Sequence, residues 1–258
     1  MSASSSRGGR PVALVTGSSR GIGRASALLF AARGHDVAIH YRREADAAEA
    51  VAKEARAVGA EALVVQGDLQ EPEVPACLLG EVGERFGRLD VLVANAASTA
   101  FKPLLEVGAR HLDLTMRTVA QSFLLLAQGA VPLMAGRPGA IVAVSGFDSI
   151  RVVPNHGLLG AAKAALEQLV RYLAVELAPH DIAVNSVLPG FVATDSARLW
   201  ADKSHPGGWT AFEAEHEPET IVAPEQIAEI IAFLCSPAGR CIRGHNLIAD
   251  AGVTLPFD

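Results

Sequence analysis

Several common features are scarce or missing in this 258-residue sequence. Its three cysteines, Cys77, Cys235 and Cys241, include no pair with the spacing of a zinc or redox motif, so we expect reduced packing residues and no metal site. The formal net charge is −6, which disfavours a nucleic-acid partner, because such proteins usually carry a basic face. No apolar run approaches the roughly 18 residues of a membrane helix. These absences predict a soluble cytoplasmic protein without a membrane partner.

The beginning of the chain also lacks an apolar segment. Residues 1–10 are rich in serine, glycine and arginine and contain no hydrophobic core of a signal peptide. We expect these ten residues to be a disordered lead-in. Half of the residues of the chain are hydrophobic, and the remaining segment, residues 11–258, is long enough for one complete core. We therefore predict a single domain.

Short apolar runs alternate with helical patterns through the rest of the chain. Continuous apolar runs of this length are typical of parallel strands that are covered on both faces. The pattern therefore predicts a Rossmann-type, doubly wound α/β fold with a seven-stranded parallel sheet. The expected strands are residues 12–16, 37–41, 62–65, 91–94, 140–144, 183–187 and a last run near 246–249. The expected helices are 22–32, 45–58, 74–86, 112–134, 155–177 and 224–235.

A glycine-rich stretch joins the first expected strand to the first expected helix. It reads Thr-Gly-Ser-Ser-Arg-Gly-Ile-Gly over residues 16–23. Glycines here permit a tight turn and let main-chain N–H groups approach a phosphate, and the helix N-terminus adds partial positive charge. The position between a strand and a helix favours a dinucleotide site over an ordinary turn.

With this loop the sequence resembles the short-chain dehydrogenase/reductase family, whose loop reads T-G-x-x-x-G-x-G. The resemblance extends over nearly the whole chain, and its nearest group is the NADPH-dependent 3-oxoacyl and enoyl acyl-carrier-protein reductases. It implies that cofactor contacts come from matching segments after successive strands. These contacts are Gly17, Ser19, Arg20, Gly21, Ile22 and Gly23 in the loop, Asp68 and Leu69, Asn95, Ala96 and Ala97, Lys163, and Pro189, Gly190, Val192 and Thr194.

The end of the second expected strand indicates which dinucleotide binds. An acidic residue there would accept the ribose 2′-OH and repel a 2′-phosphate. Here Tyr41 is followed by Arg42 and Arg43, and Arg20 lies in the glycine loop. Three guanidinium groups with no carboxylate favour a 2′-phosphate, although arginines are also common in solvated patches. We therefore predict NADPH (NADP) as the cofactor.

The catalytic positions depart from the family pattern. The resemblance implies a serine, a tyrosine, a lysine and an asparagine, of which only Lys163 remains. The tyrosine position, four residues before the lysine, is Leu159, and the serine position, seventeen before it, is Gly146. The asparagine position matches Val119 best. Ser145 is adjacent to the serine position, but neighbouring strand residues point to opposite faces.

His156 is the replacement acid that the sequence offers. Some enoyl reductases of the family place their tyrosine seven residues before the lysine, which is position 156 here. Residues seven apart share one face of a helix, and an imidazole can donate a proton near neutral pH. His156 could equally be a solvated or capping residue. Ser145 and Asp148 are weaker catalytic candidates, because Asp148 also suits a turn.

The segment between Thr194 and Ala223, a substrate lid in the family, holds both tryptophans of the chain. Trp200, Trp209 and Phe212 suggest either an apolar pocket wall or a subunit contact. A homo-oligomer, a dimer or tetramer, is implied by the resemblance and fits the apolar stripe 123–126, although a core helix would look the same.

Three functions remain open at this point. The first is an NADPH-dependent reductase of a carbonyl or enoyl group on a hydrophobic, acyl- or polyketide-like small molecule, which a carrier protein could present. The second is a non-redox enzyme on the same fold, such as a cyclase, isomerase or dehydratase. The third is a cofactor-binding scaffold without catalysis.

Overall fold

The computed structural model describes residues 9–255, and its centre is a parallel sheet of seven strands. The strand order is β3-β2-β1-β4-β5-β6-β9, which confirms the predicted doubly wound sheet with its switch point between β1 and β4. The strands are β1 (Val12–Val15), β2 (Asp36–Tyr41), β3 (Ala62–Gln66), β4 (Val91–Ala94), β5 (Gly139–Val144), β6 (Ile182–Pro189) and β9 (Asn246–Ala249).

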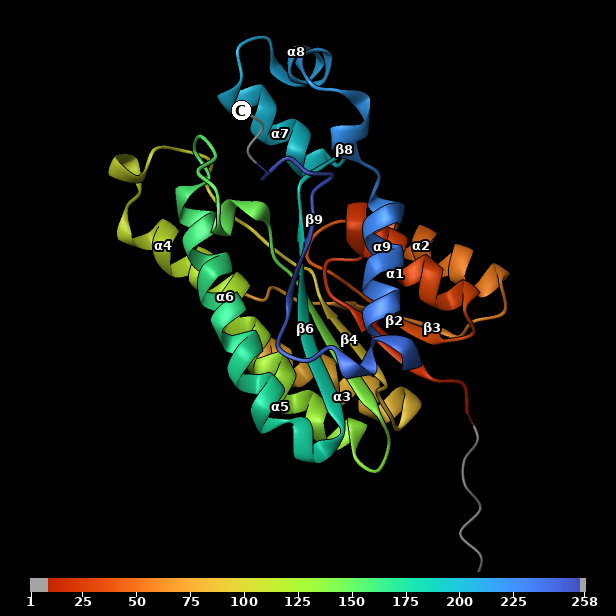
Figure 1. Ribbon diagram of the computed structural model, residues 1–258. Helices are drawn as coiled ribbons and strands as arrows, with labels where there is room; N and C mark the ends of the chain where they lie inside the picture. The colour runs from red at the N-terminus through yellow and green to blue at the C-terminus, as the bar shows by residue number, and fades with distance from the viewer. Residues whose placement is uncertain (1–8, 256–258) are drawn as a thin grey trace, which may run out of the picture.

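Helices cover both faces of the sheet (Figure 1). The helices α1 (Gly21–Ala32), α2 (Ala45–Ala57) and α9 (Pro224–Leu234) lie on one face. The helices α3 (Val74–Phe86), α4 (Ala109–Met116), α5 (Ser122–Met134) and α6 (Gly157–Glu176) lie on the other. Because both faces are covered, every residue of β1, β4 and β5 is buried, which explains the continuous apolar runs. None of the helices within residues 9–255 is long and apolar enough to cross a membrane.

The expected helix 112–134 is interrupted in the structure. A π-helical turn over Arg117–Gln121 separates α4 from α5. The Thr118 hydroxyl donates to the carbonyl of Leu114 at 2.8 Å, and the Ser122 hydroxyl donates to that of Thr118 at 2.6 Å. Hydroxyl groups that bond four residues back disturb helical bonding, and π turns recur at functional sites. In the apolar stripe that follows, Phe123 and Leu126 are buried in the core.

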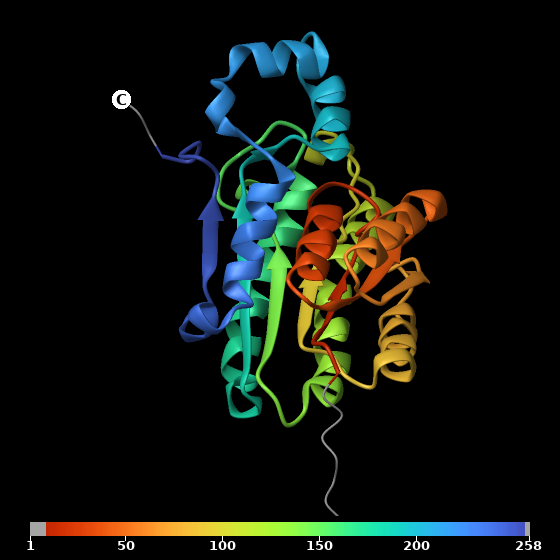
Figure 2. The same ribbon diagram turned by 90° about the vertical axis from the view of Figure 1, so that its right-hand side faces the viewer.

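Two further helices stand above the carboxyl ends of the strands, where Figures 1 and 2 show them clear of the sheet. They are α7 (Asp195–Ser204) and α8 (Gly208–Glu215). A short parallel pair, β7 (Phe191–Val192) with β8 (Ile221–Val222), joins both ends of this cap to the body. The cap therefore covers the edge where a doubly wound sheet binds its ligand.

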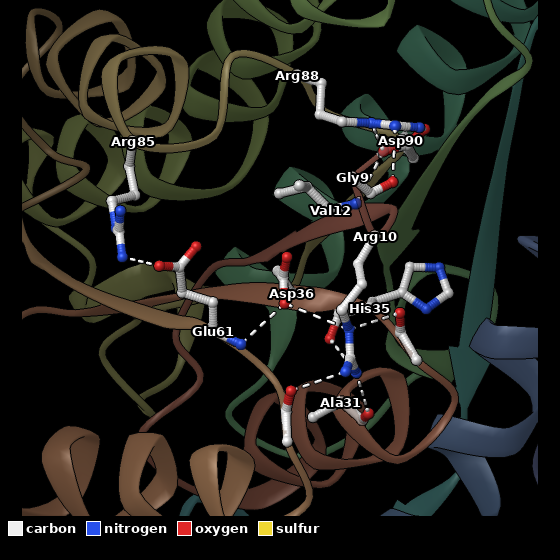
Figure 3. Close-up of polar contacts among 12 residues, drawn as sticks. Gly9, Arg10, Val12, Ala31, His35, Asp36, Glu61, Arg85, Arg88 and Asp90 are labelled. Carbon is white, nitrogen blue, oxygen red and sulfur yellow. Dashed lines mark hydrogen bonds and ion pairs between the residues drawn. The ribbon is translucent and has the colours of Figure 1, made fainter. Parts of the chain in front are cut away.

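The opposite, amino-terminal edge of the sheet is closed by charged side chains (Figure 3). Arg88 donates two hydrogen bonds to Asp90, at 2.9 and 2.6 Å. Asp90 also accepts the main-chain N–H of Val12 at 2.8 Å, which fixes the start of β1 beside β4. Arg85 pairs with Glu61 nearer the surface. The two hydrogen bonds of the Arg88–Asp90 pair fix the relative orientation of these side chains as well as compensating their charges.

Arg10 belongs to the same edge. Its guanidinium group lies 3.4 Å from Asp36 and donates to the carbonyl oxygens of Gly34 and Gly59, at 3.1 and 2.7 Å (Figure 3). The expectation of a disordered lead-in over residues 1–10 is therefore wrong for Arg10, because its side chain bonds main-chain groups far along the sequence. Residues 1–8 of that expected segment lie outside the described residues.

Candidate functional site

The glycine loop takes the conformation that its sequence predicts. Gly17 and Gly21 have φ values of 63° and 55°, which side chains with a Cβ rarely adopt. A Cβ on Gly23 would lie 2.4 Å from the carbonyl oxygen of Gly17, so only glycine fits the helix entry. The N–H groups at the start of α1 have no acidic side chain in the first turn beside them. The main-chain amides at the start of α1 are therefore open for an anion.

Asn95 and Thr16 hold the loop in place. The Asn95 amide donates to the carbonyl oxygens of Thr16 at 2.9 Å and Gly17 at 3.1 Å. In return, the Thr16 hydroxyl accepts the N–H groups of Asn95 and Ala96 at 3.0 and 3.1 Å. The segment after β4 thus supports the segment after β1, which lies next to it in the sheet.

His40 is a third support, and the sequence reading missed it. Its Nδ1 accepts the N–H of Gly17 at 3.1 Å, and its Nε2 lies 3.0 Å from the carbonyl oxygen of Gly67, to which it donates. Burial lowers the pKa of His40 to about 4, so the ring is neutral at physiological pH. His40 lies inside an apolar strand and carries no sequence signal of this role.

These segments surround a cavity of about 370 Å³ at the carboxyl ends of β1, β2, β3 and β4. The structure brings most predicted cofactor residues to its wall. They are Gly17, Ser19, Arg20, Gly21, Ile22, Tyr41, Arg42, Arg43, Asp68, Leu69, Asn95, Ala96, Ala97 and Thr194. Gly67, which precedes Asp68 in the expected adenine-contacting turn, also lines the wall, and the sequence reading missed His40, Glu44, Ser98, Thr118, Asp195 and Ser196 there. Gly23, Lys163, Pro189, Gly190 and Val192 are not on it.

The charges around this cavity are mixed. Arg42 and Arg43 line it and form no ion pair among residues 9–255, whereas Arg20 lies 3.7 Å from Asp195. Glu44 also lines the cavity. The expectation of guanidinium groups without a nearby carboxylate is therefore wrong for Arg20. Arg42 and Arg43 remain available for an anionic ligand.

The segment after β6 reaches the cavity through Thr194. Its side chain would lie 3.3 Å from a Cβ built on Gly21, and its hydroxyl accepts the N–H of Ala197 at 3.3 Å as the N-cap of α7. Gly190 passes Asp250 so closely that a Cβ would lie 2.8 Å from the Asp250 main chain. Val192 is buried under the cap.

Lys163 is buried beside the sheet on α6. Its ammonium group donates to the carbonyl oxygen of Val144 at 2.5 Å. Burial lowers the pKa of Lys163 to about 8, while the carboxylates of Asp148 and Glu167 act in the opposite direction. The lysine position of the family is thus occupied by a group that titrates near physiological pH.

Ser145 is engaged elsewhere. Its hydroxyl donates to Glu167 at 2.5 Å, and the other oxygen of Glu167 accepts the Asn246 amide at 3.2 Å. Both Ser145 and Glu167 are buried. This bonding agrees with the expectation that Ser145 points away from the serine position. We leave Ser145 out of the proposed catalytic groups.

Asp148 and His156 form a pair close to Lys163. The carboxylate of Asp148 lies 3.0 Å from Nδ1 of His156, and only 5% of the Asp148 side chain is exposed. His156 is the N-cap residue of α6, so it precedes the helix on which the spacing argument placed it. Its Nε2 is buried and has no hydrogen-bond partner within residues 9–255.

The aromatic residues of the cap form a small separate core. Trp200, Trp209 and Phe212 are buried with Phe147 and Val153 from the segment after β5. The ring of His156 stacks on Phe101 at 5.0 Å and meets Trp200 edge-on at 5.3 Å. These side chains hold the cap against the segment after β5, and His156 lies where the two meet.

The chain is similar to known proteins along nearly its whole length. Residues 17–254 match the family described as enoyl-(acyl carrier protein) reductase. The chain belongs to the short-chain dehydrogenase/reductase family. It is 39% identical to 1-cyclohexenylcarbonyl-CoA reductase of Streptomyces collinus over 95% of this chain and 88% of that protein. It is 30% identical to versicolorin reductase 1 of Aspergillus parasiticus over 93% of this chain and 95% of that protein.

A solved structure gives the same fold. The short-chain dehydrogenase of Burkholderia cenocepacia in complex with NADP superposes with a TM-score of 0.85. It is 33% identical, and the match covers 95% of this chain and 97% of that one. Membership of this oxidoreductase family confirms the resemblance that the glycine loop and the later motifs indicated.

Proposed function

We propose that this protein is an NADPH-dependent reductase of a carbonyl or enoyl group on a hydrophobic acyl substrate. The observation that carries the proposal is the cavity beneath the glycine loop, with Arg42 and Arg43 at one end. A Cβ on Gly23 would collide with the carbonyl oxygen of Gly17, so this glycine allows the close packing of helix and loop that a dinucleotide loop requires. The residues present therefore fit a dinucleotide with a 2′-phosphate.

When bound, the cofactor supplies a hydride to the substrate. Lys163 lies next to Val144 at the end of β5, where we expect its ammonium group to hold the nicotinamide ribose. Asp68 and Leu69 would contact the adenine, and Val192 with Thr194 would hold the nicotinamide side. His156 would donate the proton, because the tyrosine position is Leu159 and offers none.

Two relatives support a hydrophobic acyl or polyketide-type substrate. One is named for 1-cyclohexenylcarbonyl-CoA and the other for versicolorin. Phe101 and the buried Trp200 of the cap contact the ring of His156 and form an apolar surface against it. A thioester that a carrier protein or coenzyme A presents is compatible with this surface.

Stopped-flow absorbance at the nicotinamide band tests the function. The protein is mixed with NADPH and 1-cyclohexenylcarbonyl-CoA, and with a panel of other hydrophobic enoyl and β-ketoacyl thioesters. Loss of NADPH absorbance with formation of the reduced product supports the reductase. Product without oxidation of NADPH would instead assign a non-redox enzyme, and no conversion of any thioester would leave a cofactor-binding scaffold.

We also propose that the chain forms a homo-oligomer through α4, α5 and α6. An apolar groove on these helices is lined by Met116, Leu124, Leu169 and Tyr172, and 63% of Tyr172 is exposed. A second copy of the chain would cover this groove. Sedimentation velocity of the wild type and of Tyr172→Glu tests it, and a monomeric wild type would contradict it.

A further inference from the structure

We propose that Asp148 takes over the place of the missing serine and acts as a positioning residue, holding His156 as the proton donor. This inference rests on the proposed reductase function. Lys163, Asp148 and His156 lie around Gly146, the position at which the family has its serine. The arrangement replaces a serine and a tyrosine with a carboxylate and an imidazole.

The first observation is the space that Asp148 occupies. A Cβ on Gly146 would lie 2.4 Å from Oδ1 of Asp148, so this oxygen lies where a side chain at the serine position would begin. A Cβ on Gly160 would lie 2.3 Å from the main-chain oxygen of Asp148. Two glycines therefore make room for one aspartate. The loss of the serine and the placement of Asp148 are one structural change.

The second observation is the orientation of the imidazole. Oδ2 of Asp148 and Nδ1 of His156 are 3.0 Å apart, which fixes one ring nitrogen. The ring plane is held by Phe101, with an interplanar angle of 22°, and by the edge contact to Trp200. Nε2 is buried and has no hydrogen-bond partner within residues 9–255. A buried polar atom left unpaired is costly, which suggests that a substrate atom is its partner.

The third observation is charge. Asp148 interacts with two basic groups: its carboxylate pairs with His156, and its charge acts on Lys163. The carboxylates that act on Lys163 are those of Asp148 and Glu167, while the segment before α4 and helix α7 contribute the rings of Phe101 and Trp200 beside His156. A carboxylate that accepts from Nδ1 sets the tautomer of the ring, as in other carboxylate–histidine pairs.

The proton transfer then balances as follows. Hydride from the bound NADPH adds to the electrophilic carbon of the substrate, and the electron pair of the C=C or C=O bond moves to the neighbouring atom. The Nε2–H bond of the imidazolium breaks, its electron pair stays on nitrogen, and the proton joins that atom. His156 is left neutral with its remaining proton on Nδ1, facing Asp148, and regains the other from solvent. NADPH is oxidised to NADP⁺, and the substrate gains two hydrogens.

The test is a double-mutant cycle of Asp148→Asn and His156→Gln, with 1-cyclohexenylcarbonyl-CoA or whichever thioester the wild type reduces. Each single variant should lower kcat at least about 100-fold, the lower end of the range known for general acids. The double variant should be no more than about threefold slower than His156→Gln, because the residues act as one unit. The Kd for NADPH should stay within about twofold, which shows that the variants are folded.

A matched control comes from the cap. His205 and Glu215 form a second histidine–carboxylate pair, also at 3.0 Å, whose carboxylate is exposed. Glu215→Gln should leave kcat within about twofold of the wild type. If Asp148→Asn proves unstable, Asp148→Ser provides the same comparison with a smaller side chain.

The pH profile separates positioning from mere support of the fold. Asp148→Asn should change the shape of the pH profile of kcat, whereas Glu215→Gln should leave that profile as in the wild type. His156→Gln removes the imidazole and keeps Lys163 and Asp148, so its pH profile shows the part of the pH dependence that comes from groups other than His156. Losses that multiply in the double variant, or Asp148→Asn within threefold of the wild type, would overturn the inference. A wild type that oxidises no NADPH with any thioester would instead overturn the proposed function.

Discussion

The two edges of the sheet use charged residues in opposite ways. At the amino-terminal edge, Arg88 and Asp90 bond each other and the main chain, so their charges are largely compensated inside the protein (Figure 3). At the carboxyl-terminal edge, Lys163 is buried with its pKa lowered, and Nε2 of His156 has no partner. One edge stabilises the fold, while the other keeps reactive groups at some cost in stability.

Replacing Lys163 should give the largest loss of activity of any substitution at the carboxyl-terminal edge. We expect Lys163→Met to lower kcat/KM for NADPH-dependent reduction at least 100-fold, since the ribose contact and the charge next to Asp148 are lost. Steady-state kinetics measure this loss, and a variant within tenfold of the wild type would remove Lys163 from the site.

The same variant should change how stability depends on pH. The pKa of Lys163 is about 8 in the folded protein and about 10.5 in the unfolded chain, so the unfolded chain holds the extra proton between these values. Wild-type stability should therefore rise relative to Lys163→Met from pH 8 to pH 10.5, by about 3 kcal/mol. Urea unfolding of both proteins across this range measures the difference, and parallel curves would contradict it.

At the amino-terminal edge, a substitution should affect stability alone. Asp90→Ala leaves Arg88 and the N–H of Val12 without their acceptor, so we expect a loss of about 2 kcal/mol in the free energy of unfolding. The KM for NADPH and kcat should not change. Urea denaturation and steady-state kinetics are the measurements. Arg85→Ala is the control at the same edge, because its ion pair with Glu61 is exposed and should contribute less than about 1 kcal/mol.

A smaller effect should distinguish the two nicotinamide cofactors. Arg42→Asp places a carboxylate where a 2′-phosphate would lie, so the Kd for NADPH should rise about tenfold while that for NADH changes little. Calorimetry with both cofactors measures the ratio. An unchanged preference would show that Arg42 belongs to a solvated basic patch.

The comparison also shows which parts of the molecule could be predicted from sequence. The glycine loop was predictable because its strand, turn and helix are consecutive, and the sheet followed from the alternation of runs and helices. Two features depend on side-chain packing that no local pattern encodes. His40 links Gly17 to Gly67, and the missing side chain of Gly146 leaves the space that Asp148 occupies. Arg10 was misplaced for the same reason, since its partners lie at residues 31–36 and 59.

The π turn at Arg117–Gln121 is an intermediate case. The apolar periodicity of α4 and α5 predicted one continuous helix, and it is silent about the hydroxyl groups of Thr118 and Ser122 that interrupt it. Thr118 consequently reaches the cofactor cavity, in the segment where the sequence reading found only the loss of an asparagine.

Isothermal titration of the folded wild-type protein with NADPH, and separately with NADH, tests the central claim most directly. We predict one NADPH per chain and weaker binding of NADH, because amides of the glycine loop bind the pyrophosphate and Arg42 with Arg43 favour the 2′-phosphate. If a protein with a native circular-dichroism spectrum took up neither cofactor, the carboxyl-terminal edge would not be a dinucleotide site and the account would be wrong.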